Sequence, residues 1–124
     1  MSERNKAVAR AVFQVWNCGD LGRLDALVAD DVLHHDPHDP NAADGLEGMK
    51  ATIAANRERF PDLRLTVEDQ VAEEALVATR WVARMTEVAS GRRATLAGIT
   101  IDRFAEGKIV EAWRSYGMLN ASSG

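Results

Sequence analysis

The feature that most constrains this fold is a change of hydrophobic period about half-way along the chain. Before Pro61, apolar residues recur at three- and four-residue spacing, as they do on one face of a helix. From Leu63 to Leu119 they follow the shorter period of strands, in stretches separated by Gly or charged residues. Helices followed by long consecutive strands predict an α+β fold, with the helices packed on one face of a mainly antiparallel sheet.

The first half of the chain contains three predicted helices. They span Glu3 to Trp16, Asp20 to Ala29 and about Leu46 to Arg59, and each presents one apolar face. A brief extended run, 31–35, precedes a loop with two prolines and several turn-forming residues. Pro61 ends the third helix because proline cannot donate the backbone hydrogen bond that a helix needs.

Four strands are predicted after the third helix. Their ranges are Leu63 to Glu74, Ala75 to Ser90, Arg92 to Glu106 and Lys108 to Leu119. Gly107 lies between the last two and can adopt a positive φ without steric cost, so a hairpin is expected there. The four strands are therefore predicted to form an antiparallel meander.

Length and composition favour one globular domain, predicted for residues 1–120, with a tail at 121–124. Hydrophobic residues make up 46% of the chain and charged residues 27%, which argues against disorder. The net charge is -4 and the basic residues are scattered. This distribution provides no basic patch for binding nucleic acid or an anionic membrane, so neither is an expected partner.

Cysteine content and hydropathy suggest a cytoplasmic protein. Cys18 is the only cysteine, so no disulfide within the chain is possible. The first residues are charged and helical in period, without the apolar core of a signal peptide, and no stretch approaches the length of a membrane span.

Several segments, in this order and spacing, resemble the SnoaL-like polyketide cyclases of the nuclear transport factor 2-like superfamily. They are His35-Asp36-Pro37, Gly45-Leu46-Glu47-Gly48, Phe60-Pro61-Asp62-Leu63, Arg80-Trp81 and the run from Gly107 to Trp113. The resemblance covers nearly the whole chain. It implies a cone-shaped α+β barrel, in which three N-terminal helices pack in a curved, mainly antiparallel sheet around an apolar cavity. It also implies a homodimer that forms through the outer faces of the sheets.

The resemblance further implies an enzyme that closes a ring in a polyketide-like carbonyl compound by enolate chemistry, without a metal or organic cofactor. The family's principal acid/base is an Asp four residues after the last-strand Trp, and Gly117 stands at that position here. Because glycine has no side chain to transfer a proton, another residue must do so if the protein is a cyclase or isomerase. A related hydroxylase, an epoxide hydrolase and a non-catalytic module that binds a hydrophobic metabolite are the alternatives.

Glu111 is the first candidate to replace the missing carboxylate. On an unbroken strand its side chain shares a face with the position of Gly117, and the resemblance makes this the cavity face. An apolar cavity would raise the pKa of Glu111 and allow proton transfer near neutral pH. Two alternatives stay open: Glu111 is solvated at a strand edge, or it is paired with an arginine. A β-bulge would turn the Glu111 side chain to the other face of the sheet.

The segment from His34 to Pro40, where the extended run passes into the loop, contains all three histidines, His34, His35 and His38. Imidazole exchanges protons readily near neutral pH, and the resemblance implies that His35 or Asp36 lies near the cavity rim. His35 and Asp36 are therefore further catalytic candidates. A metal site is disfavoured because neighbouring side chains on an extended chain point apart, whereas a polar loop without chemistry stays open.

Aromatic and thioether side chains are predicted to line the substrate cavity, because such groups pack well against planar carbon skeletons. The predicted substrate-binding residues are Phe13, Trp16, Phe60, Trp81, Met85 and Trp113, with Ser115 and Gly117 from the same face of the last strand. An ordinary hydrophobic core is the alternative for each aromatic residue. Tyr116 has the opposite orientation on that strand and is assigned to a dimer contact, and Arg80 and Arg103 to ion pairs.

Overall fold

The computed structural model describes residues 2–37 and 44–119. The helical elements are α1 (Ser2–Cys18), the 3₁₀ helix η1 (Leu21–Ala26) and α2 (Gly45–Arg59). The strands are β1 (Val28–His35), β2 (Arg64–Glu73), β3 (Leu76–Thr86), β4 (Arg93–Ala105) and β5 (Lys108–Met118). The predicted His38, and the tail at 121–124, lie outside the described residues.

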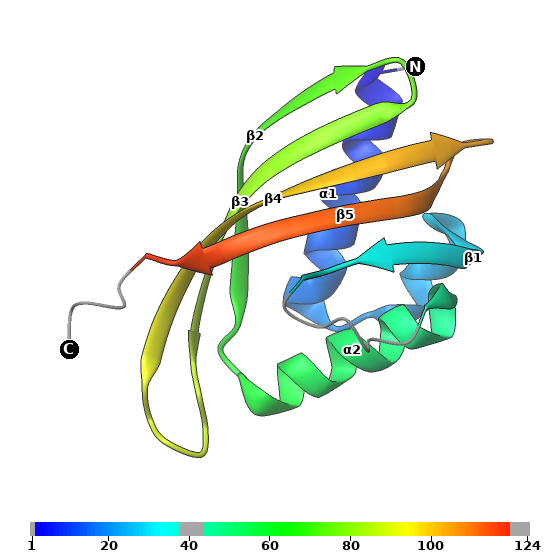
Figure 1. Ribbon diagram of the computed structural model, residues 1–124. Helices are drawn as coiled ribbons and strands as arrows, with labels where there is room; N and C mark the ends of the chain where they lie inside the picture. Colours follow the sequence, from blue (N-terminus) through cyan, green and yellow to red (C-terminus); the bar gives the residue numbers. More distant parts are fainter. Residues whose placement is uncertain (1, 38–43, 120–124) are drawn as a thin grey trace.

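All five strands form one curved sheet in the order β1-β5-β4-β3-β2 (Figure 1). Strands β2 to β5 make the predicted antiparallel meander, and β1 pairs in parallel with β5. The sheet curls around the helices without closing, because β1 and β2 lie at its two opposite edges. The expected α+β fold with a curved sheet is confirmed, and the sheet is open rather than a closed barrel.

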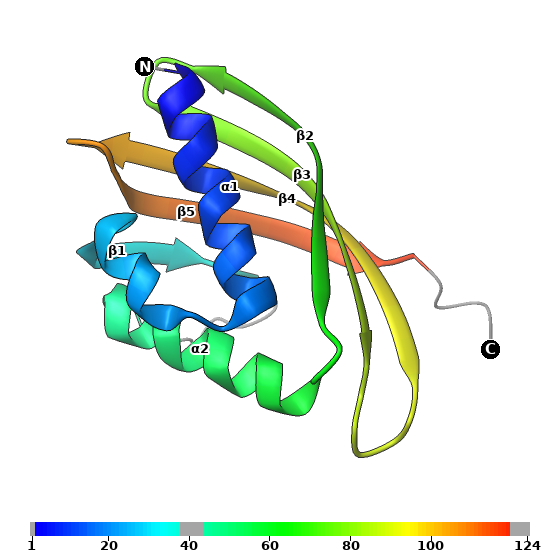
Figure 2. The ribbon, with the colours of Figure 1, turned by 180° about the vertical axis from the view of Figure 1, so that it is seen from behind.

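Both long helices cover the concave face of the sheet (Figure 2). Helix α1 packs on β2 and β3, while α2 packs on β1. Their buried residues share a stripe on each helix, including Val12 and Val15 of α1 and Ile53 of α2. Full burial of a side chain such as Ile53 stabilises the fold by roughly 1.5–3 kcal/mol, so these contacts hold the helices on the sheet.

Two polar side chains fix the C-terminal end of α1. The Asn17 amide donates to the carbonyl oxygen of Leu65 at 2.8 Å, and its oxygen accepts from the Leu65 N–H at 2.7 Å. Arg57 of α2 donates to the backbone oxygens of Trp16 and Asn17, each at 2.8 Å. The last carbonyls of a helix lack partners within it, so Arg57 satisfies two of them and ties α1 to α2.

The prediction of a second helix through Ala29 was wrong. The chain forms only a 3₁₀ helix, Leu21–Ala26, which ends where the Leu27 N–H donates to the Leu24 carbonyl at 3.0 Å. Strand β1 then begins at Val28, which is fully buried and pairs with Ile109. A β-branched residue in a buried strand pairing overrides the weak helical pattern of this short segment.

The β4–β5 hairpin forms where it was predicted. Glu106 and Gly107 both have positive φ, 52° and 80°, between the paired residues Ala105 and Lys108. Positive φ at both central residues matches the right-handed twist of the flanking strands and gives a tight two-residue turn. The turn brings β5 back along β4, which positions the residues of β5 described below.

Candidate functional site

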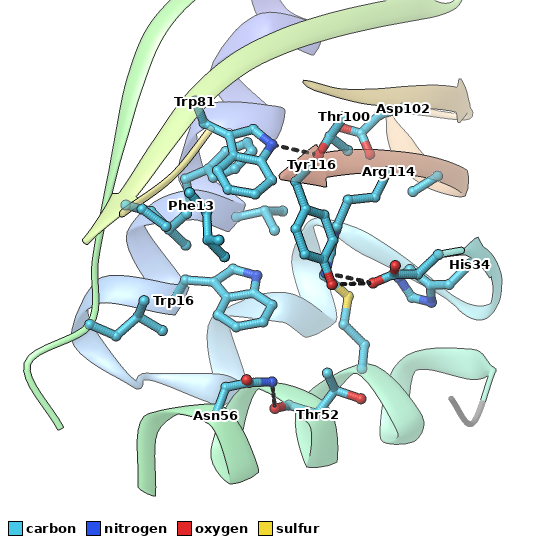
Figure 3. A pocket seen from close by; sticks show the side chains of 18 of the residues that line it. Phe13, Trp16, His34, Thr52, Asn56, Trp81, Thr100, Asp102, Arg114 and Tyr116 are labelled. Carbon is cyan, nitrogen blue, oxygen red and sulfur yellow. Dashed lines mark hydrogen bonds and ion pairs between the residues drawn. The ribbon is translucent and has the colours of Figure 1, made fainter. Parts of the chain in front are cut away.

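A cavity of about 360 Å³ lies between the two helices and the concave face of the sheet (Figure 3). Most of its wall is apolar, and it includes five of the residues predicted to bind substrate: Phe13, Trp16, Phe60, Trp81 and Met85. Cavities of this size hold drug-sized organic molecules, and such walls pack against carbon skeletons. The part of these five residues in substrate binding stays a prediction.

The predicted cavity face of β5 was wrong. Ala112, Arg114 and Tyr116 line the cavity, and Glu111, Trp113, Ser115 and Gly117 do not. The cause is a bulge: Phe104 pairs with Ile109 and Arg103 with Glu111, which leaves Val110 as an extra residue. One extra residue reverses the alternation of side chains, so the face chosen from the sequence points away from the cavity.

Glu111 instead joins a cluster with His35, Trp113 and Arg103 outside the cavity wall. Its carboxylate lies 2.7 Å from His35 Nε2 and accepts from Arg103 Nη2 at 3.0 Å. The His35 ring stacks on Trp113 with centroids 5.4 Å apart. The hydrogen bond from His35, and next the one from Arg103, lowers the pKa of Glu111, so the expected rise was wrong and the arginine-paired alternative is the one observed.

Two carboxyl groups of the described residues line the cavity: the predicted Asp36, and Asp102 of β4, which sequence reasoning missed. Asp102 is 5% exposed, and none of the described residues donates a hydrogen bond to its carboxylate. Burial raises the pKa of Asp102 from 3.8 to about 7, against a smaller opposing effect of Arg114. At neutral pH this carboxyl group therefore populates both its acid and its base form, as a proton-transfer group requires.

Four other titratable side chains share the cavity wall with Asp102: His34, Asp36, Arg114 and Tyr116. Arg114 Nη1 is 3.7 Å from Asp36 Oδ2, and the Tyr116 hydroxyl donates to the same oxygen at 3.4 Å (Figure 3). Burial, and next the positive charge of Arg114, lowers the pKa of His34, which keeps its imidazole neutral at pH 7. The site is thus polar on one side and aromatic on the other.

The aromatic side is held in place by a close contact between β3 and β4. Trp81 Nε1 donates to Thr100 Oγ1 at 3.0 Å, and the Trp81 ring lies 5.9 Å from that of Tyr116. A Cβ on Gly98 would lie 2.5 Å from Trp81 Cζ2, so only glycine lets the indole approach the sheet this closely. A lone Gly within a predicted strand was the sequence signal for this approach.

Proton transfer is the chemistry that these residues support directly. Within residues 2–37 and 44–119, no group of three or more His, Cys, Asp or Glu side chains is arranged to hold a metal ion. A base or acid at Asp102, a fixed cation at Arg114 and a hydroxyl at Tyr116 all face one apolar space. In the same described part of the chain, no helix is long and apolar enough to cross a membrane.

The fold of this chain is similar to those of several solved structures. Among solved structures, TsrD from Streptomyces laurentii is 26% identical, with a TM-score of 0.83 over 92% of this chain and 88% of that one. IdmH from Streptomyces antibioticus, described as a candidate polyketide cyclase, is 30% identical, with a TM-score of 0.78 over 90% of this chain and 91% of its own. AclR from Streptomyces galilaeus, described as a candidate hydroxylase, is 26% identical, with a TM-score of 0.81 over 96% and 82%.

A search of curated proteins found no match. The family model described as SnoaL-like polyketide cyclase matches residues 6–121, which include every strand, α2 and most of α1. The chain therefore belongs to the SnoaL-like polyketide cyclase family.

Proposed function

We propose that this protein is an enzyme that moves protons on a polyketide-like or other carbonyl compound, as a cyclase or isomerase acting without a cofactor. The observation that carries the proposal is the Asp102 carboxyl group, which is buried on the cavity wall and has a pKa raised to about 7. A group with a pKa near the working pH is the most effective acid/base catalyst, because both of its forms are present. In this proposal Asp102 transfers the proton, which Gly117 cannot do because it has no side chain.

In the proposed reaction, ionised Asp102 removes a proton from a carbon next to the substrate carbonyl. The positive charge of Arg114 stabilises the negative charge that develops on the carbonyl oxygen, since Arg114 shares the cavity wall with Asp102. Protonated Asp102 then returns the proton to the product. The apolar wall around Trp16 and Trp81 holds the carbon skeleton and excludes water, which strengthens both electrostatic effects.

The decisive variant is Asp102→Asn, which keeps the size of the side chain and removes its ability to transfer a proton. Turnover of candidate carbonyl metabolites, followed by liquid chromatography and mass spectrometry, should fall by roughly 10²- to 10⁴-fold. Binding should persist, measured by the fluorescence of the cavity tryptophans Trp16 and Trp81. The matched control is Asp69→Asn, because Asp69 is exposed and pairs only with Arg80 among the described residues. Full turnover by Asp102→Asn would refute the assignment.

The earlier candidates are tested in the same assay. His35→Ala and Glu111→Gln alter the cluster outside the cavity wall, and both should retain turnover if Asp102 transfers the proton. Loss of turnover in either variant, with Asp102→Asn still active, would return the catalytic role to that cluster.

Hydroxylation is a second candidate, favoured by the similarity to AclR, which is described as a candidate hydroxylase. The two reactions differ in the origin of oxygen in the product. Incubation under isotopically labelled dioxygen, followed by mass spectrometry, would reveal incorporated label only for a hydroxylase. Tight binding without product at any pH would instead favour the non-catalytic binding module.

A further inference from the structure

Arg114 lies between two carboxylates that compete for its charge. Strand β5, which carries Arg114, is flanked in the sheet by β1 and β4. Asp36 directly follows β1, and Asp102 belongs to β4. Arg114 pairs in register with Thr100, so Asp102 is its diagonal neighbour on the same face. Long side chains reach such diagonal neighbours, so Arg114 is able to contact either acid.

In the structure Arg114 is held by Asp36. Its Nη1 lies 3.7 Å from Asp36 Oδ2, whereas Asp102 is outside ion-pair distance of any described cation. The same Asp36 oxygen accepts the Tyr116 hydroxyl at 3.4 Å, which fixes the carboxylate from a second side. The Arg114 guanidinium also stacks over the Trp16 ring, 5.5 Å from its centroid, and this contact restricts its direction further. Figure 3 shows both contacts with Asp36 as dashed lines.

We propose that Asp36 is a positioning residue: by binding Arg114 and Tyr116, it keeps the guanidinium away from Asp102 and so leaves Asp102 able to hold a proton. Asp36 itself transfers no proton in this account. The inference deepens the proposed function, because it explains how a fixed cation and a protonatable carboxyl group coexist in one small cavity.

Arg114 is the charged group that opposes the raised pKa of Asp102. Arg114 and Tyr116 of β5, His34 of β1, and Asp36 after β1 line the same cavity as Asp102. The helices contribute no charge to the cavity wall, since their lining residues are Val12, Phe13, Trp16, Met49, Thr52 and Asn56. His34 is neutral at pH 7, so Arg114 is the single cation on this wall among residues 2–37 and 44–119. Burial raises the pKa of Asp102, and the direction of Arg114 sets how strongly its charge opposes that rise.

The test measures the titration of Asp102 itself, in the protein without substrate. Side-chain ¹³C signals of labelled aspartates are followed against pH by NMR, and Asp102→Asn identifies the Asp102 signal. In Asp36→Asn the freed Arg114 should turn to Asp102, and the titration midpoint should move down by about one to three pH units. Asp31→Asn, which removes an exposed carboxylate of β1, is the matched control and should leave the midpoint in place.

A second background separates positioning from simple charge repulsion between the two acids. In Arg114→Gln the cation is gone, so the further change Asp36→Asn should shift the Asp102 midpoint far less than it does in the wild type. An equal shift in both backgrounds would mean that Asp36 acts only through its own charge and would overturn the proposal. An unchanged or raised midpoint in Asp36→Asn would overturn it as well. Since no turnover is measured, the result is independent of whether Asp102 proves catalytic.

Discussion

Replacing Asp102 with Asn should make the protein more stable than the wild type at high pH. This advantage of the variant should shrink as the pH falls. The folded state raises the pKa of Asp102 from 3.8 to about 7, so between these values the folded protein keeps a proton that the unfolded chain has lost. Stability therefore falls as pH rises through this window, and above pH 7 the full cost of the buried charge is present. Asn is neutral throughout and bears no such cost.

The size of the effect follows from the shift. A difference of about three pH units, at about 1.4 kcal/mol each, corresponds to on the order of 4 kcal/mol for ionising the buried carboxyl group. The wild type loses stability only up to about pH 7, so a series from about pH 5 to about pH 9 covers about two of these three units. Over this series the stability of Asp102→Asn relative to the wild type should rise by about 3 kcal/mol. Groups with lowered pKa, such as Glu87 and Glu111, are common to both proteins and cancel in the difference.

Urea unfolding of both proteins across this pH range, followed by circular dichroism, measures the difference directly. The slope of the unfolding free energy against urea concentration should be the same for both proteins, since the same surface is exposed on unfolding. A stability difference that stays constant with pH would show that Asp102 titrates normally in the folded protein. That result would remove the physical basis for its role as acid and base.

Three further predictions concern the supports of the cavity and the outer face of the sheet. Gly98→Ala should destabilise the protein by about 1–3 kcal/mol in urea, because the added methyl group meets the Trp81 ring, whereas Gly117→Ala, with nothing within 4 Å of its Cβ, should be near neutral. Asn17→Ala should cost about 1–3 kcal/mol, measured by thermal unfolding, because it leaves the β2 backbone groups unpaired. The predicted homodimer would cover the exposed Ile101, so Ile101→Lys should yield monomers in sedimentation, while Val88→Lys in the β3–β4 turn should not.

The order of helices and strands was largely predictable, because the hydrophobic period of a long segment indicates whether it is a helix or a strand. Both α-helices and strands β2, β4 and β5 lie within two residues of their predicted bounds. The short second helix was not predictable in this way. It spans six residues, and pairing of Val28 with Ile109 on a distant strand decides where it ends.

The site was harder to predict because strand alternation identifies two faces without saying which is inside. In β4 the apolar Ile99 and Ile101 alternate with Thr100 and Asp102, and a simple reading buries the isoleucines. The structure does the reverse: Ile99 is 49% exposed and Asp102 is 5% exposed. In β5 the bulge at Val110 inverted the faces again. A bulge depends on pairing between strands, so the sequence of one strand does not reveal it.

The interior position of β5 in the sheet also has a consequence for how the chain folds. This strand is the last of the sheet in chain order, yet it lies between β1 and β4, and its pairing with β1 joins residues about eighty positions apart. Contacts so distant in sequence make folding slow, because a long loop must close before they can form. During synthesis the cavity therefore stays incomplete until β5 has emerged. A chain cut short before this strand would lose the link between β1 and β4 and expose two unpaired strand edges to aggregation.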